Sequence, residues 1–409
     1  MNIRPILSTL RKHRIPTALI VLEIALACAV LCNAIFMIGQ RLEAIHQPNA
    51  IDEAGLSIVT VRGLNPKNAA DDLPRNLAAL RHLPGVKAVA AINVVPLSND
   101  GWNTGFTTQS GVREFSDDSY VNVAEYLVTA DADKALGLKL LRGRFFHSEE
   151  YAAGTLGKSF MPTGHAIVIT QSFARRMWPD QDALGKVLYM GDKYSYTVVG
   201  VVADVLRPDR NGGGLASFSY SVFLPMAPVE AALNKYLVRS APQDRARVLR
   251  EAVSTLEKIS PEAVVNGKTF SDIRNAYFAD TRSMAWMLVL VCVVMVAVTA
   301  FGIVGLSSFW VGQRRRQIGI RRAVGATRAD ILHYFQTENF LISSFGVVLG
   351  MLLAYGANLY LMQHYEMARM PWTFFPVGAV TLWLIGQLSV LGPALRASHV
   401  PPVVATRSV

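Results

Sequence analysis

The chain has 409 residues, a mean hydropathy of +0.29 and a formal net charge of +10. Residues 40–280 are neutral, with 26 basic and 26 acidic side chains, whereas the other residues hold 14 basic and 4 acidic ones. The basic excess therefore lies beside apolar segments and not on a domain surface. This distribution argues against a nucleic-acid-binding protein.

Four apolar segments are long enough to cross the hydrocarbon core of a bilayer, which takes about 20 helical residues. They are residues 16–39, 284–311, 338–362 and 374–395. The first is longer than the apolar core of a signal peptide and no clean cleavage site follows it, so we expect an uncleaved anchor. The predicted fold class is a membrane protein with four transmembrane helices and a large domain, residues 40–280, between the first two helices.

Short segments rich in Lys and Arg predict the orientation, because such segments stay in the cytoplasm. Residues 1–15 carry four basic side chains and no acid, and residues 312–335 carry six Arg and one Asp. We expect both termini, the tail 396–409 and segment 312–335 in the cytoplasm, and residues 40–280 and loop 363–373 outside. Residues 1–15 are predicted to form an amphipathic segment on membrane lipids, with an ordinary basic flank as the alternative.

The large domain mixes strand and helix patterns. Runs rich in β-branched residues predict strands at 56–62, 86–96, 166–170, 193–204, 217–224, 235–239 and 263–270. Helical patterns occur at 71–82, 171–177 and 243–258. This alternation predicts an α+β domain, which we interpret as two subdomains, with the glycines 212–214 at a turn or boundary.

No catalytic or metal-binding constellation stands out in the sequence. Gly154 to Ser159 is similar to a phosphate-binding loop, but the position where that motif requires its first glycine is Ala152. We therefore expect no enzymatic activity, no metal and no cofactor in this chain. The cysteines lie in apolar segments and are interpreted as small buried hydrophobes, with a redox or metal role as the alternative: Cys28, Cys32 and Cys292.

The segment after the second span reads QRRRQIGIRRAVGATRADI from Gln313 to Ile331, and GPALRASHVPP follows the last span from Gly392. Both resemble permeases of the MacB/FtsX superfamily of ABC transporters. The order of parts, one span followed by a large domain and three more spans, is also similar to that of this superfamily. Residues 135–146 and 169–179 resemble its MacB-type branch. Where the family usually has Glu before Ile-Gly, this chain has Gln317.

The resemblance implies a permease in the bacterial inner membrane that transmits the motion of an ATPase to a periplasmic domain. That motion would drive efflux of a drug, peptide or lipid-like substrate. Separate ABC ATPase subunits, which would hold ATP and Mg²⁺, are implied as partners, as are a second permease copy or paralogue, a periplasmic adaptor and an outer-membrane channel. The alternatives are an FtsX-like scaffold that controls periplasmic enzymes, a lipoprotein-releasing permease, or a ligand-sensing receptor.

The resemblance also places the ATPase-coupling element in the segment after the second span. We expect one or two short helices there that dock in a groove of the ATPase, with apolar and arginine contacts and a close approach at the small residues. A simple positive-inside loop is the alternative. The residues are Arg315, Arg316, Gln317, Ile318, Gly319, Ile320, Arg321, Arg322, Ala323, Val324, Gly325, Ala326, Thr327 and Arg328.

Polar and small residues inside the spans are further candidates. Glu23 lies within the first span, where an ionisable group is costly, so we expect either a role in coupling or a structural hydrogen bond or ion pair. Small residues allow helices to approach closely, and we expect helix packing at Gly302, Gly305, Gly346 and Gly350. Pro393 is predicted to end or kink the fourth helix.

Overall fold

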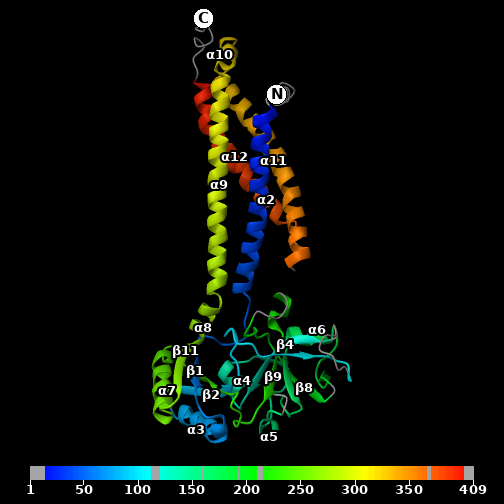
Figure 1. The fold of residues 1–409 in the computed structure, drawn as a ribbon, viewed down its shortest axis with the longest axis vertical. Helices are drawn as coiled ribbons and strands as arrows, with labels where there is room; N and C mark the ends of the chain where they lie inside the picture. Colours follow the sequence, from blue (N-terminus) through cyan, green and yellow to red (C-terminus); the bar gives the residue numbers. More distant parts are fainter. Residues whose placement is uncertain are drawn as a thin grey trace. The chain divides into compact units, whose positions relative to one another are not determined.

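A computed structural model describes residues 14–111, 120–157, 161–191, 193–209, 215–365 and 370–399. The chain forms two compact units, which Figure 1 colours along the sequence. The membrane unit comprises the residues up to His46 and those from Thr281 onward, and the globular domain is Gln47–Asp280. The glycines 212–214 and most of the predicted amphipathic segment 1–15 lie outside the described residues.

In its described residues, the membrane unit has four helices that are long and apolar enough to cross a membrane, and one short helix. Hydropathy locates only the part of a helix that lies in lipid, so the helices extend beyond the predicted spans. α11 begins at Arg328, inside the segment 312–335 that we expected to be a loop, and α12 continues past Pro393, which therefore does not end it. The helices are α2 (Arg14–Ile45), α9 (Ala279–Gln313), α10 (Arg315–Ala323), α11 (Arg328–Tyr365) and α12 (Phe374–Ser398).

α11 packs against both α2 and α12. A Cβ at Gly346 would lie 2.8 Å from Cβ of Ile24, and a Cβ at Gly350 would lie 2.7 Å from the carbonyl oxygen of Ala25. Both distances are shorter than van der Waals contact, so the approach of α11 to α2 requires glycine at these two positions. Gly305 differs, because a Cβ there would meet no atom of the described residues within 4 Å.

The described residues of the globular domain form one mixed sheet of eleven strands. Its main path runs β11-β1-β10-β2-β4-β9-β6-β8-β5, with β3 paired to β4 and β7 paired to β8. The pairs β4–β9 and β6–β8 are parallel. The strands are β1 (Leu56–Arg62), β2 (Val86–Ile92), β3 (Asn103–Phe106), β4 (Val121–Val128), β5 (Leu140–Gly143), β6 (Ala166–Thr170), β7 (Val187–Met190), β8 (Tyr194–Val202), β9 (Ser221–Pro225), β10 (Lys235–Ser240) and β11 (Val264–Thr269).

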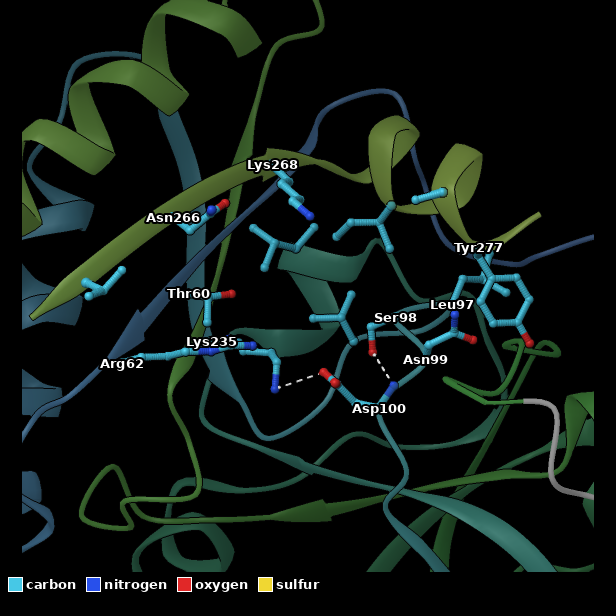
Figure 2. A pocket seen from close by; sticks show the side chains of 15 residues that line it. Thr60, Arg62, Leu97, Ser98, Asn99, Asp100, Lys235, Asn266, Lys268 and Tyr277 are labelled. Atoms are coloured by element: carbon cyan, nitrogen blue, oxygen red, sulfur yellow. Dashed lines mark hydrogen bonds and ion pairs between the residues drawn. The ribbon is translucent and has the colours of Figure 1, made fainter. Parts of the chain in front are cut away.

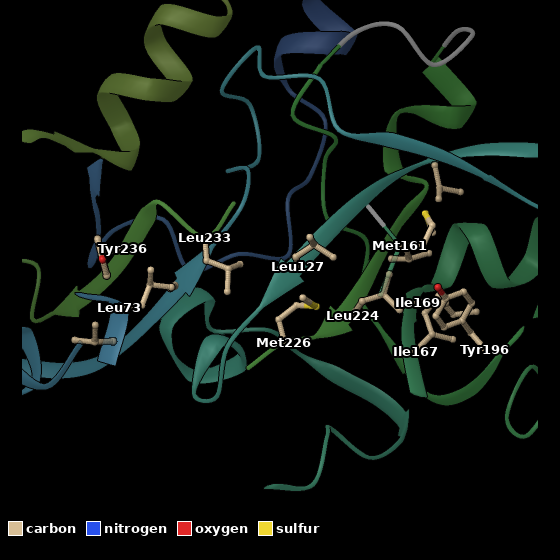
Figure 3. Packing of buried hydrophobic residues seen from close by; sticks show 14 of the residues in the cluster. Leu73, Leu127, Met161, Ile167, Ile169, Tyr196, Leu224, Met226, Leu233 and Tyr236 are labelled. Atoms are coloured by element: carbon tan, nitrogen blue, oxygen red, sulfur yellow. The ribbon is translucent and has the colours of Figure 1, made fainter. Parts of the chain in front are cut away.

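Helices cover the sheet, and α3 and α7 pack on the same half of it, over β2 and over β1 and β11 respectively. One apolar core continues from this half into the other. Figure 3 shows Leu73 and Leu233 at one end of it, Leu127 between, and Ile169 and Tyr196 at the other end. The helices are α3 (Ala69–Arg81), α4 (Ala132–Leu136), α5 (Ser148–Ala153), α6 (Gln171–Met177), α7 (Arg245–Ile259) and α8 (Phe270–Tyr277).

A narrow seam between β2 and β4 joins the two halves of the sheet. Within the described residues, Ile92 and Val128 are the single ladder pair between these strands. Side chains add hydrogen bonds: Asn93 Oδ1 accepts from the Leu127 N–H at 2.9 Å, and Thr129 Oγ1 accepts from an N–H of β2 at 2.8 Å. The two subdomains expected from the sequence thus share one sheet and one core.

Residues 217–224, expected as one strand, are divided between two elements. Leu215–Ser219 form the 3₁₀ helix η2, and β9 begins at Ser221. The side chain of Thr170 hydrogen-bonds the backbone between these two elements. Its Oγ1 donates to the Ser219 carbonyl at 2.6 Å and accepts from the Ser221 N–H at 3.1 Å. At Ser219 and Ser221, these side-chain hydrogen bonds take the place of the strand-to-strand hydrogen bonds that a continuous strand 217–224 would make.

Among the buried charged side chains of the globular domain, Glu125 and Arg207 differ in how their charge is compensated. Glu125 on β4 is buried, and burial raises its pKa to about 8 despite a smaller opposing effect of a hydrogen bond with Trp102. Arg207 is fully buried, donates to the Asn122 side chain at 2.7 Å and lies 3.7 Å from Asp209. Hydrogen bonds therefore offset the cost of burying the Arg207 charge. The cost of burying Glu125 is avoided mainly because its carboxyl group stays protonated, and so neutral, up to a higher pH.

Candidate coupling site

The turn between α9 and α11 is a defined structure with a cap at each end. The backbone after α10 reverses at Gly325, whose φ of +107° is accessible to glycine without strain. The Gly325 N–H then donates to the Arg322 carbonyl at 3.2 Å. A reciprocal cap starts α11: the Thr327 N–H donates to the Asp330 carboxylate at 2.8 Å, and the Asp330 N–H donates to Thr327 Oγ1 at 3.2 Å.

A buried ion pair ties the start of α10 to α11. Nη1 of Arg314 donates to both carboxylate oxygens of Glu338, at 3.0 and 2.9 Å. The two side chains are only 9% and 3% exposed, and the guanidinium also lies 5.3 Å from the ring centroid of Trp310 on α9. This pair fixes the junction of α9 and α10 against the body of α11.

The pair of Arg314 and Glu338 was not among the functional residues predicted from the sequence. A signal was present, because Glu338 is one of only four acids outside residues 40–280 and lies at the edge of an apolar segment. An isolated acid in such a position usually has a partner inside the protein. Sequence spacing did not reveal which of the six nearby arginines that partner is.

Two of the arginines predicted to contact the ATPase make contacts within this chain. The Arg321 guanidinium lies 4.5 Å from the centroid of the Tyr334 ring on α11. Nη1 of Arg322 donates to the carbonyl oxygen of Ser398 at the end of α12, at 2.9 Å. These contacts hold α10 against α11 and α12, and contact of either arginine with a partner stays a prediction.

The predicted apolar contact residues divide between an inner and an outer face. Ile318 is 4% exposed and belongs to the apolar core of the membrane unit, so it does not contact a partner as we expected. Ala326 is half-buried against the same core. Val324 is 85% exposed and Ile320 is 49% exposed, although both are apolar.

The exposed residues form one surface around the end of α10, which we call the α10 face. Its apolar centre, Ile320 and Val324, lies beside the small residues Ala323 and Gly325. Arginines flank this centre, and their positive charge suits an acidic surface on a partner. Gly319 is buried and does not contribute. The α10 face consists of Arg315, Arg316, Gln317, Ile320, Ala323, Val324, Gly325, Thr327 and Arg328.

Glu23 lies beside Gly302 of α9. A Cβ at position 302 would overlap the Glu23 carboxylate, so glycine leaves room for this side chain between the two helices. Among the residues that the structure describes, no ion pair of Glu23 is found, and a role of Glu23 in coupling stays a prediction. Gly302 therefore accommodates a carboxylate, whereas Gly346 and Gly350 accommodate a neighbouring helix.

The segment similar to a phosphate-binding loop does not form an anion cradle in its described part. The Gly154 N–H donates to the Tyr151 carbonyl at 3.2 Å, and the Gly157 N–H donates to the Met161 carbonyl at 2.8 Å. These two amides are thus engaged within the protein and do not converge on a common point. No cluster of three metal-ligating side chains occurs among the described residues either.

These features define a class of protein: a polytopic membrane protein with a large α+β domain between its first two helices and a structured turn between its second and third. Two family models match the chain. A MacB-like periplasmic core domain covers residues 17–259, and an FtsX-like permease C-terminal domain covers residues 289–402. The chain belongs to the MacB/FtsX superfamily of permeases, and its globular domain is periplasmic.

Curated relatives are similar over much of the chain. The macrolide export ATP-binding/permease protein MacB of Chromobacterium violaceum is 26% identical over 96% of this chain, and that of Bradyrhizobium diazoefficiens is 32% identical over 55%. The chain spans 58% and 35% of the lengths of these two proteins. The crystal structure of the periplasmic region of MacB from Actinobacillus actinomycetemcomitans matches 56% of this chain and 94% of that one, with 14% identity and a TM-score of 0.37.

Proposed function

We propose that this protein is the permease subunit of a MacB-like ABC transporter that carries the motion of an ABC ATPase across the inner membrane to its periplasmic domain. The resulting movement of that domain drives the export of a periplasmic substrate. The FtsX-like match covers only the C-terminal membrane part, residues 289–402. The MacB-like match over residues 17–259 favours the transporter over a regulatory scaffold.

The observation that carries this proposal is the way α10 is fastened. Arg314 joins it to Glu338 of α11, and Arg322 joins it to Ser398 of α12. A displacement of α10 is therefore transmitted directly to α9, α11 and α12, because no flexible loop lies between α10 and these helices. A segment that only signals topology would need its charges but not these attachments.

We propose that the ATPase binds the α10 face, with Val324 and Ile320 in a groove and Arg315, Arg316 and Arg328 near acidic groups. The α10 face and both termini then lie in the cytoplasm, in agreement with the distribution of short basic segments. In this proposal, ATP and Mg²⁺ are bound by the ATPase. The exposed apolar residues Trp286 and Phe301 of α9 offer a surface for lipid or for a second permease copy.

Replacement of Val324 tests the docking surface without changing any charge. Full burial of a valine side chain contributes about 1.5–3 kcal/mol, so Val324→Asn should weaken ATPase binding by about 1–2 kcal/mol, or roughly 5- to 30-fold. The measurement is the vanadate-sensitive ATPase activity that co-purifies with the tagged permease from native membranes. Val229→Asn, at an exposed valine of the globular domain, is the matched control.

We expect Val324→Asn to insert and accumulate normally while losing most of the co-purifying ATPase activity. The control should retain the wild-type amount. Equal ATPase recovery with Val324→Asn and wild type would show that the α10 face is not the docking surface. Absence of any ATPase from the wild-type complex would contradict the proposed transporter itself.

A further inference from the structure

The globular domain has an open pocket of about 320 Å³ on the face of β1 and β11 that α7 does not cover. Side chains of a strand alternate between the two faces of a sheet. Val59 and Val61 belong to the core under α3 and α7, so Ile58, Thr60 and Arg62 point to the opposite face and line the pocket. α8 closes one side of it (Figure 2).

One part of the pocket is apolar. Its floor contains Ile58, Val95 and Leu97, which are all buried, and Ile273 and Tyr277 come from α8. In Figure 2, Leu97 and Tyr277 lie together at one end of the pocket. Solvent reaches the apolar part of the pocket mainly at Ile273 and Ala276 of α8. Such a surface can hold the hydrocarbon part of a small ligand.

The other part of the pocket is cationic. Figure 2 shows Arg62, Lys235 and Lys268 around the end away from Tyr277, with Asp100 as the only acid among the lining residues. Lys235 binds this acid at 3.2 Å and also donates to the Asn93 carbonyl at 2.7 Å.

The two other cations have no such partner. In the part of the chain that the structure describes, neither Arg62 nor Lys268 forms an ion pair. Asp272, the acid whose charge interacts with Lys268, is already engaged in the cap of α8. Hydrogen bonds from Thr269 are the main cause of its lowered pKa. The residues that line the pocket therefore carry two more positive charges than negative ones.

We propose that this pocket binds a small anionic amphiphile with a single short hydrocarbon chain. Its anionic head lies between Arg62 and Lys268, and its chain lies against Ile273 and Ala276 of α8. A volume of about 320 Å³ is at the lower end of the range for small-molecule sites and suits a medium-length carboxylate better than a larger ligand. The excess positive charge disfavours a cationic amphiphile of the same length. This binding does not depend on the proposed transport activity.

Photolabelling of the full chain in nanodiscs of phosphatidylcholine tests the site directly. The probe is a decanoate analogue with a diazirine in its chain, and the labelled peptides are identified by mass spectrometry. We expect saturable labelling within residues 95–100 and 264–277 that decanoate suppresses and decyltrimethylammonium does not. Labelling confined to other segments, or equal suppression by the cation, would overturn the proposal.

Charge removal provides the second measurement. Arg62→Gln combined with Lys268→Gln should lower the apparent affinity of the probe roughly tenfold, as expected for two partly exposed ion pairs. The matched control is Lys67→Gln with Lys258→Gln, which removes two exposed lysines away from the pocket and should leave the affinity unchanged. Wild-type affinity in the Arg62 and Lys268 double variant would contradict the assignment of the anionic head.

Discussion

The ion pair between Arg314 and Glu338 offers the sharpest test of how the coupling site is held together. Glu338→Gln keeps the size of the side chain but leaves the Arg314 cation buried without its counterion. Because the arginine side chain is only 9% exposed, solvent cannot replace the lost carboxylate. Loss of one partner of a buried pair costs about 3–5 kcal/mol, which corresponds to at least a hundredfold increase in opening of the bundle.

The native cysteines supply the assay. Cys28 and Cys32 are buried between α2 and its neighbours, so their reaction with a thiol reagent reports opening of the helices in the full chain. A Cys292→Ser background removes the third, partly exposed thiol. We expect Glu338→Gln to speed labelling about a hundredfold, whereas Arg314→Met combined with Glu338→Leu restores most of the protection, because no charge is then buried alone.

Two outcomes would refute this reasoning. The first is wild-type labelling in Glu338→Gln, which would mean that solvent or lipid headgroups already compensate Arg314. The second is a double variant as unstable as the single one, which would mean that the pair acts through its shape and not its charge. Glu262→Gln, at an exposed acid of the globular domain, controls for the loss of one negative charge.

Three further predictions concern other parts of the molecule. Burial raises the pKa of Glu125 from 4.5 to about 8, so the domain loses stability as the pH rises between these values. Glu125→Gln should therefore gain about 3 kcal/mol at pH 7, visible as stronger amide-exchange protection, and little at pH 4. Gly350→Val should disrupt the contact of α11 with α2 and lower the amount of folded protein, whereas Gly305→Val, which points to open space, should not; equal yields would contradict this. A cysteine replacing Glu262 should react with an impermeant maleimide in spheroplasts, and one replacing Ala329 should not; labelling at 329 would reverse the proposed topology.

Local patterns in the sequence predicted much of the globular domain. The strands 56–62 and 166–170 and the helix 171–177 have the same bounds in the structure, because β-branched runs end at clear helix or turn signals. The order of strands in the sheet was beyond this reasoning. β1 pairs with β10 and β11, which follow it by more than 170 residues, and no local pattern encodes such a partner.

The candidate coupling site was located from the sequence, but its faces were not. Over nine residues α10 makes only a few turns, and apolar residues occur on both sides of it. Ile318 and Ile320 are two positions apart and therefore point in different directions, yet nothing in the sequence shows which side meets α11. The buried position of Ile318 and the exposure of Val324 follow from tertiary packing alone.

The seam between β2 and β4 has a mechanical consequence for the globular domain. A sheet resists sliding of its strands through ladder pairs that must break together. Among the described residues, the seam has one such pair, Ile92 with Val128, and two flanking backbone hydrogen bonds, from the Asn93 N–H to Leu127 and from the Thr129 N–H to Ala91. Tension across the domain would therefore separate the strands at this line first, while the longer ladders on either side stay intact. The side-chain hydrogen bonds of Asn93 and Thr129 also join β2 to β4 and favour the same register when the two strands pair again after separation.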